Sequence, residues 1–291
     1  MNLTMEWNCT RLMQSPLFLP LRPVIARLEA ASGFPSLQDC NALLEMRDPR
    51  ITAQSGRPVC FMPQESGRLP FERQYEPRCY LTGEVPTRER NWHDLFNALV
   101  WLTFPGAKAA INSNHYHALM DASAPEGSGS QRGAVRDVNT LFDESGVIVA
   151  YADAVLADLL RNFKWKELFW QRREEVGARM EFCILGHGLY EKALKPYTGI
   201  TGQGLPLQVE PAFFGWPLDR RLAYLDNLLA DHLSDPRHCS NTRDLTPVPL
   251  LGVPGWAADN EHESYYDNTL YFRPGRRTRP KPSDGFAESA A

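Results

Sequence analysis

The sequence has no long hydrophobic run. Its richest apolar window, LFNALVWLTFP, covers residues 95–105 and ends at a proline, whereas a membrane-spanning helix needs roughly 20 apolar residues. The first residues, MNLTMEWNCTRLMQ, lack the basic segment and the apolar stretch that make up a secretory signal peptide. We therefore expect a cytoplasmic protein without a membrane segment.

The sequence also lacks closely spaced cysteines and an excess of positive charge. The six cysteines are scattered and form no CxxC pair, which is typical of reduced thiols in a cytoplasmic protein. The net charge is -4 and the pI is about 6.0, so the chain as a whole lacks the basic surface of a nucleic-acid-binding protein. The local exception is the Pro- and Arg-rich segment Arg273–Lys281, where contact with RNA stays open.

The common signatures of enzyme families are missing as well. There is no GxGxxG after a strand, no GxxxxGK[ST], no GxSxG and no HExxH, which excludes several well-known nucleotide-binding and hydrolytic motifs. The spaced glycines of GITGQGLP at 199–206 end in a proline and open no helix, so they make a poor phosphate loop. Candidate chemistry has to be sought in individual polar residues instead.

Hydrophobic periodicity predicts more helix than strand. The expected helices cover residues 22–31, 36–46, 91–103, 106–121, 153–162, 165–178, 187–194 and 218–233. Two β-rich runs within 138–152 flank Glu144-Ser145-Gly146 and predict a β-hairpin. Short extended pieces are expected at 180–186 and 205–211. The strands alternate with helices too rarely for a doubly wound sheet, so the sequence predicts an α+β fold that is mostly helical.

Composition also predicts the organisation of the chain. We expect one globular domain over 1–273, in which residues 1–90 form a long irregular segment that wraps a core at 91–272. Residues 123–133, SAPEGSGSQRG, are small and polar and predict a loop. Residues 274–291 are rich in proline, arginine and small residues and predict a disordered tail.

The expected helix at 91–103 carries its polar residues on one side. At 100° per residue, Arg90, His93, Asp94 and Asn97 fall into one arc, and hydrophobic residues cover much of the remaining circumference. A solvent-exposed stripe would normally use lysine and glutamate, which favour helix more strongly. The short polar groups of this arc therefore need another explanation.

Two interpretations of this helix stay open. In the first, it forms the wall of a polar pocket, with His93 as general base or metal ligand and Asp94 or Asn97 beside it. In the second, Asn91 caps the helix and Asp94 interacts with the helix dipole. Capping accounts for Asn91 and Asp94, but it leaves His93 and Asn97 unexplained.

A second candidate is the pair His187 and Glu191 in GHGLYEK. The two residues are four apart and share one face of the expected helix at 187–194. Facing a histidine and an asparagine on another helix, they could hold a metal. The alternative is a hydrogen-bonded histidine at the junction between a strand and a helix.

The expected hairpin brings charged residues together in sequence. Asp143 and Glu144 could bind a divalent cation or take part in acid–base chemistry, whereas Asp-Glu-Ser-Gly is also good turn chemistry. Arg136 and Asp137 precede the first expected strand and could pair with the polar arc of helix 91–103. The catalytic candidates are thus His93, Asp94, Asn97, Arg136 and Asp137, and the metal candidates are Asp143, His187 and Glu191.

Four segments of the sequence carry a family resemblance: RNWHDLFNALVWLTFPGAKAAIN, RDVNTLFDESGVIVAYAD, GHGLYEKALKP and PLLGVPGW. Together they resemble a bacterial family known as domain of unknown function 3025, and the resemblance runs from about residue 78 to 273. It implies one family-sized domain in a soluble bacterial protein, and it supplies no activity. The polar positions of these motifs fall on His93, Asp94, Asn97, Asp143, Glu144, His187 and Glu191.

Two functions are compatible with these candidates. The first is an enzyme that hydrolyses a small molecule or transfers a group from it, with His93 as base and a divalent metal on some of the three metal candidates. The second is a non-catalytic binding or scaffold protein, in which buried polar residues form a structural network. Its aromatic residues would then contact a protein partner; they are Trp216, Trp256, Tyr265, Tyr266, Tyr271 and Phe272.

Overall fold

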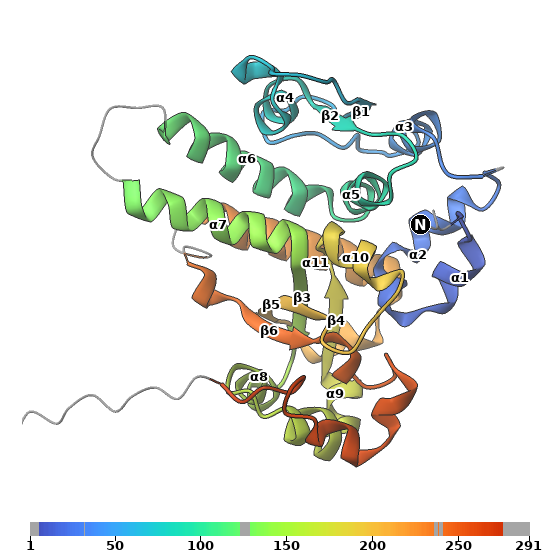
Figure 1. The fold of residues 1–291 in the computed structure, drawn as a ribbon, viewed down its shortest axis with the longest axis vertical. Coiled ribbons are helices and arrows are strands. Elements are labelled where there is room, and N and C mark those ends of the chain that lie inside the picture. Colours follow the sequence, from blue (N-terminus) through green and yellow to red (C-terminus); the bar gives the residue numbers. More distant parts are fainter. Residues whose placement is uncertain (1–5, 32, 123–128, 236–237, 239–240, 276–291) are drawn as a thin grey trace, which may run out of the picture.

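The structure is a computed structural model of the chain, and it describes residues 6–31, 33–122, 129–235, 238 and 241–275. Helices surround two small sheets of four and two strands (Figure 1), which confirms the predicted α+β class. Among these residues, no helix is both long and apolar enough to cross a membrane. Most of the expected loop at 123–133 and nearly all of the expected tail at 274–291 lie outside the described residues.

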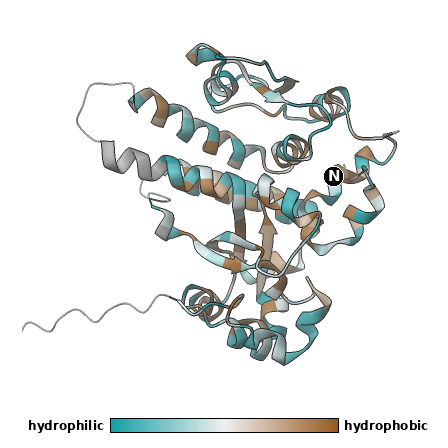
Figure 2. Ribbon diagram, in the orientation of Figure 1, coloured by the Kyte–Doolittle hydropathy of each residue, from teal (hydrophilic) through white to brown (hydrophobic). Residues whose placement is uncertain are grey.

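The four-stranded sheet lies at the centre of the core. It consists of β3 (Gly146–Tyr151), β4 (Met180–Ile184), β5 (Thr201–Gln208) and β6 (Thr246–Pro249) in the order β4-β3-β5-β6. Strand β3 pairs antiparallel with β4 and parallel with β5, and β5 pairs antiparallel with β6. All six residues of β3 are buried, which explains the continuous apolar run of its sequence; Figure 2 shows hydrophobic residues concentrated on these strands.

Long helices pack beside this sheet. Helices α6 (Pro105–Ala122) and α7 (Gly129–Ser145) lie side by side, and α11 (Leu218–Ser234) packs against α6 (Figure 1). Helix α5 (Trp92–Thr103) contacts α10 (His187–Ala193). The helices predicted at 91–103, 106–121, 187–194 and 218–233 are thus observed with small shifts of their ends. The predicted cap is also observed, because the side chain of Asn91 accepts a hydrogen bond from the Asp94 N–H.

The N-terminal part is more regular than predicted. Its elements are α1 (Cys9–Gln14), α2 (Arg22–Ile25), α3 (Leu37–Glu45), β1 (Cys60–Pro63), α4 (Tyr75–Thr82) and β2 (Glu84–Thr87). The strands β1 and β2 pair in parallel. Ser36 and Asp39 form a capping box that starts α3. The helices predicted at 22–31 and 36–46 are thus observed in shorter form, and strand pairing adds order to the rest of the segment that was expected to be irregular.

The predicted hairpin around residues 144–146 is wrong. Helix α7 continues to Ser145, and only the second β-rich run forms a strand, β3. Val138 and Phe142 are buried at a spacing of four residues while Asp137 is exposed, which is helical periodicity rather than alternation. The Asp-Glu-Ser-Gly sequence therefore ends a helix instead of forming a turn between strands.

The helix predicted at 165–178 is also interrupted. After α8 (Ala154–Arg161), a π-helical turn covers Glu167–Gln171, and α9 begins only at Arg173 and ends at Arg179. Three of the aromatic residues expected to contact a protein partner are instead buried in the core, namely Tyr266, Tyr271 and Phe272. The other three, Trp216, Trp256 and Tyr265, are half-buried and pack against it.

The backbone at the end of α7 lies in close contact with the backbone at the start of α10. The β3–β4 ladder pairs Val147 with Ile184, so the two helices adjoin the same end of that ladder. A Cβ atom at Gly186 would lie 2.5 Å from the backbone nitrogens of Ser145 and Gly146. No larger residue fits there without a shift of the chain, and this close approach sets the last turn of α7 against the first turn of α10.

A buried carboxylate joins α11 to α6. Asp226 accepts hydrogen bonds from the backbone N–H groups of Gly106 and Ala107, at 3.0 and 2.9 Å. These groups lie in the first turn of α6, where N–H groups have no partner within the helix. Burial raises the pKa of Asp226 to about 6, although the two hydrogen bonds lower it.

This raised pKa predicts a pH dependence of stability. The folded protein holds the Asp226 proton more tightly than the unfolded chain does. Protonated Asp226 therefore stabilises the fold fully below about pH 3.8, and this contribution is lost as the pH rises through about 6. We expect the unfolding free energy of the wild type, relative to Asp226→Asn, to fall by about 3 kcal/mol between about pH 3.5 and about pH 7. Urea titrations across this range measure the difference; a value that does not change with pH would contradict it.

Candidate functional site

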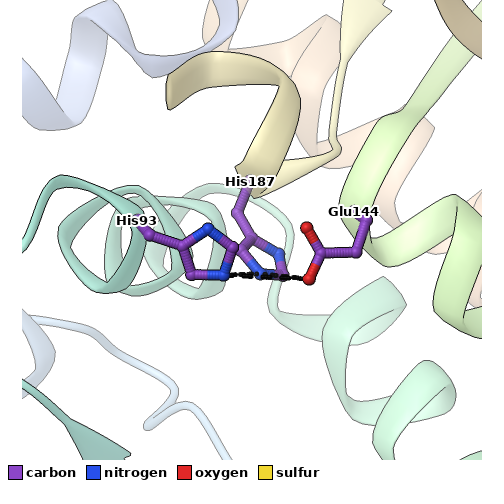
Figure 3. Close-up of side chains that lie close together, drawn as sticks. All are labelled: His93, Glu144 and His187. Carbon is purple, nitrogen blue, oxygen red and sulfur yellow. Dashed lines mark hydrogen bonds and ion pairs between the residues drawn. The ribbon is translucent and has the colours of Figure 1, made fainter. Parts of the chain in front are cut away.

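Three side chains from three helices point toward one another (Figure 3). His93 lies in the first turn of α5, Glu144 in the last turn of α7, and His187 is the first residue of α10. The Nε2 atoms of the two histidines are 3.0 Å apart. Oε1 of Glu144 lies 3.7 Å from Nε2 of His93 and 3.4 Å from Nε2 of His187. These three residues are called the His–Glu–His cluster below.

The distances within the cluster suit a single cation. A point equidistant from the three atoms lies about 2.0 Å from each of them, close to the roughly 2.0–2.2 Å at which zinc binds histidine nitrogen and carboxylate oxygen. Among the described residues, this is the group of histidine, cysteine and acidic side chains close enough to hold a metal ion. Without a metal, the two imidazoles can share one hydrogen bond, which requires a proton on one of the two Nε2 atoms.

Carboxylates stand behind both imidazole rings. Oε2 of Glu191 lies 3.2 Å from Nδ1 of His93, and Oδ2 of Asp143 lies 3.6 Å from Nδ1 of His187. The first distance is a hydrogen bond and the second is longer than one. A carboxylate at Nδ1 favours the tautomer that leaves the Nε2 lone pair free, as behind many metal-bound histidines. Both lone pairs then point into the cluster.

Glu144 is held against the start of α10 by two glycines. One is Gly186, described above. At the other, Gly188, an added Cβ atom would lie 2.3 Å from Oε2 of Glu144, so the carboxylate occupies the space that a side chain would take. A hydrogen bond with His187 lowers the pKa of Glu144, and the nearby His93 and His187 lower it further. Glu144 is therefore ionised at neutral pH.

The cluster forms part of the wall of a cavity of about 430 Å³. The wall is mostly polar and draws on α4, α5, α6, α7 and α10. Of the residues proposed from sequence, the cavity is lined by His93, Asp94, Asn97, Arg136, Asp143, Glu144 and His187. Asp137 is exposed and Glu191 lies behind His93, and neither is among the lining residues.

Asp94 is fully engaged with Arg88. Its two oxygens accept hydrogen bonds from the guanidinium at 3.0 and 2.8 Å, and one also accepts from the Arg88 backbone N–H at 2.6 Å. The carboxylate is buried. It therefore anchors the segment before α5 as well as facing the cavity.

Asn97 holds a tyrosine that sequence reasoning did not single out. Its amide Nδ2 donates to the hydroxyl of Tyr75 at 2.6 Å, while its Oδ1 is buried without a hydrogen-bond partner. Because the Tyr75 oxygen accepts this bond, its own O–H proton is free to be donated into the cavity. Tyr75 comes from α4, in the part of the chain expected to be irregular, so only the fold brings it to the site.

Asp143 forms a buried ion pair with Lys108 of α6. Burial raises the pKa of Asp143, but the charges of Lys108 and His187 and the hydrogen bond from Lys108 bring it down to about 2. Lys108 is itself only 3% exposed. The Asp143 carboxylate is therefore ionised, and it interacts electrostatically with Lys108 and His187.

His115 is a further buried histidine of the cavity. Its Nδ1 lies 3.1 Å from a Glu76 oxygen, and its Nε2 lies 3.2 Å from the Thr140 hydroxyl. Burial lowers the pKa of His115, but the hydrogen bond and charge of Glu76 outweigh this and raise it. The sequence showed only that His115 and His117 face different sides of a helix, which gave no reason to select either one.

Comparison with known proteins gives one match. The family model described as "Protein of unknown function (DUF3025)" matches residues 59–276. A search of curated proteins and a search of solved structures each gave no match. The matched region contains the whole His–Glu–His cluster and every residue that lines the cavity.

Proposed function

The chain belongs to the DUF3025 family, as the sequence motifs predicted, and from the geometry of its cavity we propose that it is a metal-dependent hydrolase or group-transfer enzyme. The observation that carries this proposal is the convergence of two imidazole Nε2 atoms and one carboxylate oxygen on one point. Two histidines and one glutamate form the ligand set of several zinc hydrolases, in which the fourth position stays open for water or substrate.

A divalent ion at this point would supply Lewis-acid chemistry, because it polarises a carbonyl or phosphoryl oxygen and lowers the pKa of bound water to about 7. Its ligands would be His93, Glu144 and His187. Of the two roles expected for His93 from sequence, base or ligand, this proposal uses the ligand. His187 keeps its expected role as a ligand, whereas Glu144 replaces Asp143 and Glu191, which would orient the two imidazoles through their Nδ1 atoms.

Tyr75 and Asn97 suit the step of a hydrolysis in which the leaving group is protonated. As water adds to the carbonyl or phosphoryl centre, the bond to the leaving group breaks, and the leaving group must take up a proton. The Tyr75 hydroxyl is placed to donate it, since Asn97 occupies one lone pair of its oxygen and leaves its O–H free. Tyr75 is returned to its neutral form by a proton from the attacking water.

Elemental mass spectrometry of the purified chain tests the metal, and chromogenic carboxylic and phosphoric esters test the reaction. We expect one divalent transition metal per chain and an ester hydrolysis that a chelator abolishes and added metal restores. A chain that takes up no divalent metal and cleaves no ester would overturn the proposal. The buried polar residues would then be a network that only holds the fold.

Glu191 provides a milder test of the arrangement behind the ligands. Replacing it with alanine removes the carboxylate at Nδ1 of His93 and so removes the preference for the tautomer that binds metal. We expect zinc affinity to fall by about tenfold, near the lower end of such effects because Glu191 is half-exposed. Competition with a chromogenic chelator measures this. The neighbouring exposed Lys192→Ala serves as control, and an equal loss in both variants would speak against the proposed role.

A further inference from the structure

One side of α7 runs the length of the cavity. Arg136, Thr140 and Glu144 follow one another at intervals of four residues, and all three line the cavity. At 100° and 1.5 Å per residue, they fall within an arc of about 80°, and Arg136 lies about 12 Å along the helix axis from Glu144. The His–Glu–His cluster thus sits at one end of this side and a guanidinium at the other.

Arg136 differs from the other charged residues of the wall. Arg88 is paired with Asp94, Asp143 with Lys108, Glu76 with His115, and Glu144 with the two histidines. Arg136 is exposed, and within the described part of the chain no acidic side chain forms an ion pair with it. Its charge therefore stays available to a molecule that enters the cavity.

The space beside Arg136 is less polar than the cluster end. Helices α6 and α7 pack against each other, and His115 contacts Thr140 across the gap. Because the two helices run in opposite directions (Figure 1), Leu119, one turn beyond His115, lies opposite Arg136, one turn before Thr140. Leu119 also lines the cavity. A ligand reaching from the cluster to Arg136 would pass an apolar side chain near its far end.

We propose that the substrate carries an anionic group, a carboxylate or a phosphate, remote from the bond that is cleaved, and that Arg136 binds this group. The proposal rests on the proposed function, since it takes the His–Glu–His cluster as the reacting end. Bidentate binding by a guanidinium fixes the orientation of a carboxylate or phosphate. Arg136 would therefore act as a specificity residue that places the reactive bond at the cluster.

Cobalt-loaded protein and simple dicarboxylates test this without knowledge of the substrate. One carboxylate is expected to bind at the cobalt, where it changes the visible absorption, and the other to reach Arg136. In the series malonate, glutarate, suberate, we expect the longest member to bind on the order of tenfold more tightly than acetate. A phosphonocarboxylate of the same length shows whether phosphate or carboxylate is preferred at the far end.

The variants separate the two proposals. In Arg136→Gln, suberate is expected to bind no more tightly than acetate, while cobalt uptake and acetate binding stay as in the wild type. Arg161→Gln, on α8 and away from the cavity, should keep the preference for the longer chain. Equal affinities for all chain lengths in the wild type, or an unchanged preference in Arg136→Gln, would overturn the role of Arg136. Failure to take up cobalt would instead overturn the metal site.

Discussion

Replacing Lys108 with methionine is expected to lower the free energy of unfolding by about 3–5 kcal/mol. Lys108 is buried between α6 and α7, where its ammonium group pairs with the buried carboxylate of Asp143. Methionine fills most of the same space but leaves Asp143 ionised without its main partner. An uncompensated buried charge is among the most destabilising changes a side-chain substitution can make, and urea denaturation measures it.

Two further variants identify the cause. Changing both partners, Lys108→Met with Asp143→Leu, removes the lone charge and should recover much of the lost stability. Lys166→Met breaks ion pairs with Glu263 and Asp267 at the surface, and such exposed pairs contribute little to stability because water and salt screen them. If Lys108→Met were no more destabilising than Lys166→Met, the buried pair would not have the importance given to it here.

Replacing Glu144 with alanine is expected to abolish stoichiometric metal binding. This substitution removes one of the three ligand atoms, so zinc affinity should fall by more than the roughly 10–100-fold that follows the loss of a residue behind a ligand. The chain should still fold, because Glu144 is partly exposed and its side chain does not form part of the apolar core. Isothermal titration with zinc measures the affinity, and far-UV circular dichroism checks the fold.

Asp137→Ala is the matched control for this experiment. Asp137 is a carboxylate on the same helix, but it is exposed and does not line the cavity. Its removal should leave zinc affinity unchanged. Tight zinc binding by Glu144→Ala, or an equal loss in both variants, would show that the metal is held elsewhere. In that case Asp143, His187 and Glu191, the set first expected from sequence, would be the next to test.

The sequence predicted the local part of this site well. Helix α5 and its Asn91 cap depend on residues that are close in sequence, where periodicity and capping chemistry decide the structure. Of the predicted polar arc, His93, Asp94 and Asn97 lie on α5 and line the cavity, whereas Arg90 precedes the cap and lies outside the helix. The α+β class and the family were also predictable, the first from the sparse strands and the second from the motifs.

Residues 138–145 show why the hairpin prediction failed. Val138, Thr140 and Phe142 are residues that strands favour, and the sequence that follows them suits a turn. Packing against α6 and the sheet instead selected the helix, in which Val138 and Phe142 share a buried side. Intrinsic preference for strand is weak enough for such contacts to override it.

The membership of the His–Glu–His cluster could not be predicted from the spacing of residues along the sequence, because it depends on contacts between distant segments. His93, Glu144 and His187 come from separate helices, so no short motif links them. The role of Glu144 rests on the approach of α10 to α7, and that of Tyr75 on the placement of α4 over α6. The sequence therefore pointed to several residues that line this cavity, but it did not indicate which of them lie within contact of one another.

The close contact at Gly186 has a consequence for how the site is assembled. Glu144 lies at the end of α7, directly before β3, and His187 lies at the start of α10, shortly after β4. Because β3 and β4 pair, the relative position of the two residues is fixed once this pairing forms. His93 belongs to α5, which is anchored separately by Asp94 and Arg88. An ion bound by all three residues would hold α5 against the β3–β4 pair, and a chelator that removes the ion would release α5 from it. Amide hydrogen exchange should therefore slow in the first turn of α5 on metal loading and change little along β3.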